Sequence, residues 1–128
     1  MFVNEKNFFT LIILFFQSSP VFSETWITIT NFYEDGNYYK RSIDVNSIVK
    51  NGFRRYANMK YIKNDSFGTT FGITINCKDG IFIFDGSTIS RRVSKNNWIY
   101  LDSFGGNKPS AWTREAEGSY NLLCEEWK

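Results

Sequence analysis

Two cysteines and a small set of carboxylates are the residues of this chain whose types could support chemistry. Cys77 and Cys124 are its only cysteines, and the chain has no histidine. Thiolates bind metals or exchange disulfides mainly in closely spaced pairs or beside histidine, and these two are far apart in the sequence. A structural disulfide is therefore favoured over the alternatives of a metal site or a redox centre. It would stabilise the fold by roughly 3–4 kcal/mol.

The carboxylates offer the second route to chemistry. The six aspartates are Asp35, Asp44, Asp65, Asp79, Asp85 and Asp102. Most of them lie in Asp-Gly, Asn-Asp-Ser or helix-cap contexts, where aspartate commonly turns the chain. Two of them acting as general acid and base stay an open alternative. The absence of histidine removes the commonest general base near neutral pH. The sequence also lacks a nucleophile elbow, a P-loop and a dinucleotide-binding glycine pattern. We therefore predict a protein that is not an enzyme, with no catalytic, cofactor-binding or metal site.

The elements that position these residues are predicted to be mainly strands. Period-two alternation, β-branched residues and aromatic residues are typical of a half-buried antiparallel sheet. The pattern predicts about six strands, drawn from residues 25–32, 38–43, 53–62, 69–77, 81–84, 87–94 and 98–101. Asp-Gly pairs separate several of these segments, as in tight hairpins. Residues 44–52 are expected to form one helical or 3₁₀ turn, with Asp44 as its cap and Gly52 as its stop.

The end of the chain changes to helical spacing. Apolar residues recur at intervals of three and four, and they are Trp112, Ala116, Tyr120, Leu123 and Trp127. Cys124 lies on the same side, and residues 104–109 are predicted to be a loop. Gly118 lowers helix propensity by about 1 kcal/mol, so a helix that begins only after it is the alternative. The fold class is α+β: an antiparallel sheet with a C-terminal helix packed on one face and tied to it by the Cys77–Cys124 disulfide.

The start of the chain resembles an export signal. Residues 8–16 form a nearly uninterrupted apolar run, which is too short to span a bilayer but suits the hydrophobic region of a signal peptide. Lys6 precedes the run, and Val21-Phe22-Ser23 provides a cleavage site after Ser23. A buried hydrophobic helix is the alternative. We predict a signal peptide over residues 1–23 and one domain over residues 24–128, which is exported and is either periplasmic or secreted to the cell surface or beyond. No cysteine lies near the cleavage point, so no lipid anchor is expected.

Charge and composition restrict the partners. The net charge is +2, with acidic and basic side chains mixed along the chain. Nucleic-acid binding normally needs a strongly basic face, so we do not expect a nucleic-acid partner. No apolar segment after Ser23 is long enough to cross a membrane. Aromatic residues make up 19% of the chain, which lets a short domain build a core.

Several motifs together resemble one protein family. A strand led by Trp26 is followed by Tyr38-Tyr39, by Asp44-Val45-Asn46-Ser47-Ile48 with Gly52, by a strand ending in Cys77, and by Tyr120-Asn121-Leu122-Leu123-Cys124. This order is similar to the surface-adhesin protein E family of Gram-negative bacteria, over residues 24–124. The resemblance implies antiparallel strands with a C-terminal helix disulfide-bonded to their concave side. It also implies binding to host proteins such as vitronectin and laminin, although the lipidated cysteine of the founding member has no counterpart here.

The function that follows is a non-enzymatic binding domain of a bacterial envelope, adhesin-like, that recognises a protein partner. An inhibitor of a cell-wall-degrading enzyme in the periplasm is the alternative, and a purely structural envelope protein is not distinguished from these by sequence. Sheet faces and edges can bind partners through side chains or main-chain hydrogen bonds. The candidate partner surface consists of Arg54, Tyr56, Lys60 and Tyr61. No cofactor is expected.

Overall fold

The computed structural model describes residues 23–101 and 108–127, so the predicted signal peptide up to residue 22 and most of the predicted loop at 104–109 lie outside the described residues. Seven strands are followed by one helix and its π-helical continuation. They are β1 (Trp26–Glu34), β2 (Asn37–Asn51), β3 (Arg54–Lys63), β4 (Ser66–Asn76), β5 (Ile81–Phe84), β6 (Thr88–Ser94), β7 (Asn97–Leu101), α2 (Thr113–Tyr120) and η4 (Asn121–Glu126). The sheet thus has seven strands rather than about six, and every neighbouring pair is antiparallel and consecutive in sequence.

The region predicted to be a helical turn is instead part of β2. β2 runs without interruption to Asn51, and its pairing with β3 resumes at Val49 opposite Tyr56 after a bulge that follows Asp44. The prediction failed because cross-strand pairing on both sides of the bulge outweighs the local polar composition. Asp44 still caps a local turn, since its Oδ1 accepts hydrogen bonds from the amides of Thr25 (2.9 Å) and Asn46 (3.0 Å).

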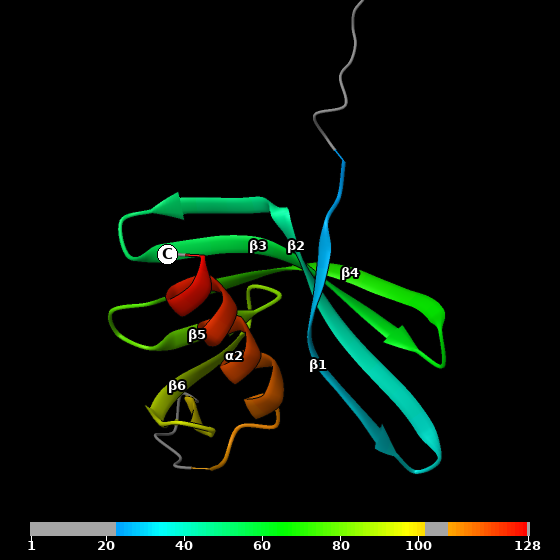
Figure 1. Cartoon of the computed structure of the whole chain (residues 1–128). Coiled ribbons are helices and arrows are strands. Elements are labelled where there is room, and N and C mark those ends of the chain that lie inside the picture. The colour runs from blue at the N-terminus through cyan, green and yellow to red at the C-terminus, as the bar shows by residue number, and fades with distance from the viewer. Residues whose placement is uncertain (1–22, 102–107, 128) are drawn as a thin grey trace, which may run out of the picture.

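The sheet curls around the C-terminal helix, as Figure 1 shows. α2 contacts β1 and β7, which are the two edge strands, so the helix spans the open side of the curl. The core lies between them. Its fully buried side chains include Ile43, Met59, Ile75, Phe82 and Leu123. The predicted α+β fold, with one helix packed on one face of an antiparallel sheet, is therefore confirmed.

The helix extends through Gly118 and covers nearly the whole stretch in which apolar residues recur at helical spacing. α2 starts at Thr113, five residues before Gly118, and η4 continues it to Glu126. A Cβ built on Gly118 would lie 3.0 Å from both the Cβ and the carbonyl oxygen of Ile29. Gly118 is therefore a contact point where the helix backbone approaches β1, and its packing advantage outweighs its low helix propensity.

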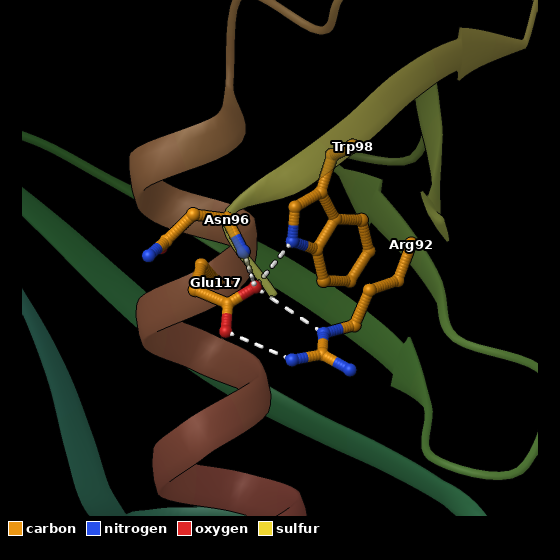
Figure 2. Close-up of polar contacts among 4 residues, drawn as sticks. All are labelled: Arg92, Asn96, Trp98 and Glu117. Carbon is orange, nitrogen blue, oxygen red and sulfur yellow. Dashed lines mark hydrogen bonds and ion pairs between the residues drawn. The ribbon is translucent and has the colours of Figure 1, made fainter. Parts of the chain in front are cut away.

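A disulfide and a buried carboxylate are two of the links that hold the helix to the sheet. The predicted disulfide is present, joining Cys77 after β4 to Cys124 in η4 with a Cα–Cα distance of 5.5 Å. The second link is Glu117, a residue that is 4% exposed. Its carboxylate accepts four hydrogen bonds (Figure 2). The donors are Arg92 Nε (3.2 Å) and Nη2 (3.1 Å), the Asn96 amide (3.0 Å) and Trp98 Nε1 (2.8 Å).

The Glu117 contacts also fix its charge state. Burial by itself would raise the pKa of the Glu117 carboxyl, but the hydrogen bonds from Arg92, Trp98 and the Asn96 amide outweigh it and lower the pKa below its usual range. Glu117 is therefore held as a carboxylate that fastens the helix to the β6–β7 hairpin.

Candidate binding face on the outer side of the sheet

The face of the sheet that points away from the helix carries a continuous line of apolar and small side chains. Residues that pair directly across neighbouring strands share a face of the sheet. One such line crosses six strands, from β2 to β7, and consists of Val49, Tyr56, Thr74, Ile83, Ile89 and Leu101. None of these side chains is fully buried, and Val49 is 57% exposed. The outer face therefore presents apolar surface on a sheet whose other face already packs against the helix.

A first hollow lies on one side of this line. It encloses about 450 Å³ above β3 and β4, next to the β5–β6 turn. Its lining residues are Ser47, Val49, Tyr56, Ala57, Asn58, Gly72, Ile73, Thr74, Asp85 and Gly86. Gly72 leaves the floor open, because a Cβ built there would meet no atom within 4 Å. The hollow thus combines hydrogen-bonding groups with an aromatic side chain.

The bulge in β2 builds one wall of this hollow. The Ser47 hydroxyl accepts a hydrogen bond from the Asn58 amide (2.8 Å) and donates one to the Asp44 carbonyl (2.6 Å). Ser47 therefore takes the place of a paired strand residue opposite β3. The residues between Asp44 and Val49 have no direct register partner on β3, and a bulge of this kind re-aims side chains.

A second hollow adjoins the first across Tyr56 and Thr74, which line both. It encloses about 420 Å³ and is otherwise lined by Arg54, Asn76, Asp79, Ile81 and Ile83. The Asp79 carboxylate accepts a hydrogen bond from Asn76 Nδ2 (3.2 Å). Arg91 pairs with Ile81 on the next strand and is exposed. An apolar floor beside Arg54, with Arg91 on the neighbouring strand, distinguishes this hollow from the first.

The structure divides the four residues of the predicted partner surface. Arg54 and Tyr56 lie at the hollows of the outer face. Lys60 lies on the same face farther along β3, where its Nζ is 4.2 Å from the centre of the Trp26 ring. Tyr61 alternates to the inner face and packs against the core. Because side chains of a strand alternate between faces, consecutive residues such as Lys60 and Tyr61 do not form one surface.

Tyr61 instead belongs to a cluster of charged and aromatic side chains beneath the helix. The Arg41 guanidinium carbon lies 3.6 Å from the centre of its ring, and Arg41 Nε is 3.1 Å from Glu115 Oε2. The Tyr61 hydroxyl is buried and has no hydrogen-bond partner among the described residues. Burial, followed by the charge of Glu115, raises the pKa of the Tyr61 hydroxyl well above its usual range. Burial also raises the pKa of the Glu115 carboxyl, against the effect of Arg41.

The residues of the outer face are suited to binding a protein partner by direct surface contact. Tyrosine and arginine beside partly exposed aliphatic side chains are common where protein interfaces derive most of their binding energy. Within the described residues, no three His, Cys, Asp or Glu side chains come together in a group that could hold a metal ion. Of the aspartates considered for acid–base chemistry, Asp79 and Asp85 line different hollows, and Asp102 lies outside the described residues.

Sequence reasoning missed several residues of this face. Ser47 was assigned to a helical turn, and Gly72, Ile81 and Ile83 were regarded only as strand residues. Asp85 was interpreted as a turn residue. A usable signal was the alternation in residues 81–84, because placing Phe82 and Phe84 in the core leaves Ile81 and Ile83 on the opposite face.

Comparison of the chain with protein-family models, with curated proteins and with solved structures finds no match. The resemblance to the surface-adhesin protein E family therefore depends on the sequence motifs. No helix in residues 23–101 and 108–127 has the length and apolar character needed to cross a membrane.

Proposed function

We propose that this chain is an exported, non-enzymatic binding domain of a bacterial envelope, and that it holds a protein partner against the outer face of β3, β4 and β5. The observation that carries the proposal is the pair of adjoining hollows separated by Tyr56 and Thr74. The sequence resemblance to the surface-adhesin protein E family supports a partner among extracellular or envelope proteins.

The physical basis is the composition of the two hollows. Tyr56 offers a large, partly exposed ring at the centre, where a partner would exclude water from both of its sides. Ile81 and Ile83 provide apolar area, and Arg54 provides a donor that can pair with a carboxylate at the rim. A side chain from the partner would fill each hollow and bury the otherwise open strand surface.

The test uses variants that change this face while leaving the core alone. Gly72→Trp fills the first hollow, where the backbone leaves room for a side chain, and Tyr56→Ala removes the wall between the hollows. Tyr33→Ala, at a residue that is 78% exposed on β1, is the matched control. Binding of the purified, disulfide-bonded protein to immobilised vitronectin, laminin and envelope proteins would be measured at micromolar concentration.

We expect Gly72→Trp and Tyr56→Ala each to weaken binding by at least tenfold, the size of about 1.4 kcal/mol, and Tyr33→Ala to leave it unchanged. The absence of any bound protein, or equal binding by all variants, would contradict the proposal. If the wild type instead inhibits lysozyme or another cell-wall hydrolase and Gly72→Trp does not, the inhibitor alternative replaces adhesion.

A further inference from the structure

The turns at the two ends of the strands carry opposite charges. Three hairpin turns lie at one end, namely β1–β2, β3–β4 and β5–β6, and each contains an aspartate: Asp35, Asp65 and Asp85. The other three, β2–β3, β4–β5 and β6–β7, carry lysines at or next to the turn: Lys50, Lys78 and Lys95. All six of these side chains belong to exposed residues. Exposed Lys63 lies beside the β3–β4 turn, and exposed Glu34 beside the β1–β2 turn. We call the second group of turns the basic end.

Exposed apolar side chains gather at the basic end. Six large hydrophobic residues are exposed among those described, and three of the six lie in or beside these turns. They are Val49 (57% exposed), Phe53 (59%) and Val93 (52%). A fourth, Trp127, is 42% exposed and follows Cys124, which the disulfide joins to Cys77 at the start of the β4–β5 turn. Single exposed apolar residues are ordinary, but their concentration beside lysines is not.

The contacts show that these turns form one surface. Lys78 Nζ lies 5.3 Å from the centre of the Phe53 ring, and the Cys77 amide donates to the Phe53 carbonyl (2.8 Å). Val93 and Lys78 line the same shallow hollow. Figure 1 shows the β2–β3 and β4–β5 connections and the red end of the C-terminal helix on the same side of the molecule. The β2–β3, β4–β5 and β6–β7 turns therefore lie on one surface of the molecule.

We propose that the basic end docks on the surface of an anionic lipid bilayer. Phe53 projects from the β2–β3 turn, and Val93 lies at the irregular end of β6 beside the β6–β7 turn, so both can enter the headgroup region at the ends of the strands. Lys50, Lys78 and Lys95 face the negative surface, and the aspartate-bearing turns lie at the far end of the strands, away from it. This charge separation would orient the molecule on the bilayer. The inference does not rest on the partner proposed for the outer face, and Val49 and Arg54 belong to both surfaces.

The acidic groups near the basic end do not reverse its charge. Asp79, Glu125 and Glu126 are exposed there. The Asp79 carboxylate is engaged by Asn76 Nδ2. The cations are Lys50, Arg54, Lys78, Arg91 and Lys95, all exposed, which outnumber these three acids. The lysines alone would be enough to bind an anionic polymer, which has no apolar layer. The exposed Phe53 and Val93 favour a bilayer instead.

The experiment is co-sedimentation of the purified, disulfide-bonded protein with vesicles of phosphatidylcholine, with and without phosphatidylglycerol. We expect binding that requires phosphatidylglycerol and decreases when salt is raised from about 0.05 to 0.5 M. Lys78→Glu should weaken binding by at least about fivefold, and Phe53→Ser by about fivefold. Lys63→Glu makes the same charge change at the opposite end and should stay within about twofold of the wild type, as should Tyr33→Ser.

Three results would overturn the inference. The first is no binding to phosphatidylglycerol vesicles at low salt. The second is an equal loss from Lys78→Glu and Lys63→Glu, which would show a response to net charge rather than to the basic end. The third is binding that Phe53→Ser leaves intact and that soluble polyglutamate displaces, which would identify an anionic polymer as the ligand. Unchanged circular dichroism and thermal midpoints would show that each variant is folded.

Discussion

Removing the Glu117 carboxylate should be among the most damaging changes to this fold. Glu117→Ala leaves the Trp98 indole N–H and the Arg92 guanidinium without their acceptor, and Trp98 is only 1% exposed. Breaking a buried ion pair by removing one partner costs about 3–5 kcal/mol. The Arg92 side chain is 24% exposed and can recover some hydration, so we expect a loss of about 3 kcal/mol.

Glu117→Gln removes the negative charge of the side chain and keeps its shape. The amide oxygen can still accept from Trp98 Nε1 and the Asn96 amide, while the charge opposite Arg92 is lost. We therefore expect a smaller loss of about 1–2 kcal/mol. Urea unfolding of the oxidised protein, followed by tryptophan fluorescence, gives both values. A loss below 1 kcal/mol for Glu117→Ala, or equal losses for the two variants, would refute the role assigned to this carboxylate.

The wild type and Glu117→Gln together test how the free energy of unfolding depends on pH. Because the folded pKa of Glu117 is lowered, its stabilisation is present above the ordinary glutamate pKa and is lost as pH falls through the folded pKa. The pKa of Glu115 is raised, so its contribution has the opposite sign: it is present at low pH and is lost as pH rises through the folded pKa. The difference in unfolding free energy between wild type and Glu117→Gln should therefore shrink below about pH 4. A constant difference from pH 7 to pH 3 would contradict this.

The remaining predictions concern three other positions, each measured by the free energy of unfolding. Gly118→Ala should destabilise by about 1–3 kcal/mol, because the added methyl group meets Ile29; an unchanged protein would show that the helix can move aside. Cys77→Ser with Cys124→Ser should lose about 3–4 kcal/mol, and a loss below 1 kcal/mol would show that the cross-link constrains little. Tyr61→Phe should be neutral or stabilising by up to about 1 kcal/mol, since its buried hydroxyl lacks a partner among the described residues; a large loss would reveal one.

Local patterns predicted most of the sheet, because alternation and turn residues act over a few positions. The segments at 53–62, 69–77 and 81–84 correspond closely to β3, β4 and β5. The segment at 44–52 failed for a tertiary reason: Val49 to Asn51 pair with β3, and no local signal announces that pairing. The role of Gly118 was likewise not visible locally, since the residue that requires glycine there is Ile29, far away in the sequence.

Only part of the candidate site could be predicted from the sequence. Arg54 and Tyr56 could be placed on a strand, and their face followed from alternation. The hollows beside them depend on the bulge that brings Ser47 to Asn58 and on the approach of the Asp85 turn to Gly72, whose carbonyl accepts from the Asp85 amide (3.0 Å). Such contacts between distant segments arise from register, which single-sequence periodicity does not specify.

The most direct test of the whole proposal is the intact mass of the protein recovered from its native host. An exported domain closed by Cys77–Cys124 should begin near Glu24 and should weigh two hydrogens less than its reduced form. A chain that still begins at Met1 and carries two free thiols would contradict both the export and the covalent attachment of the helix to the sheet.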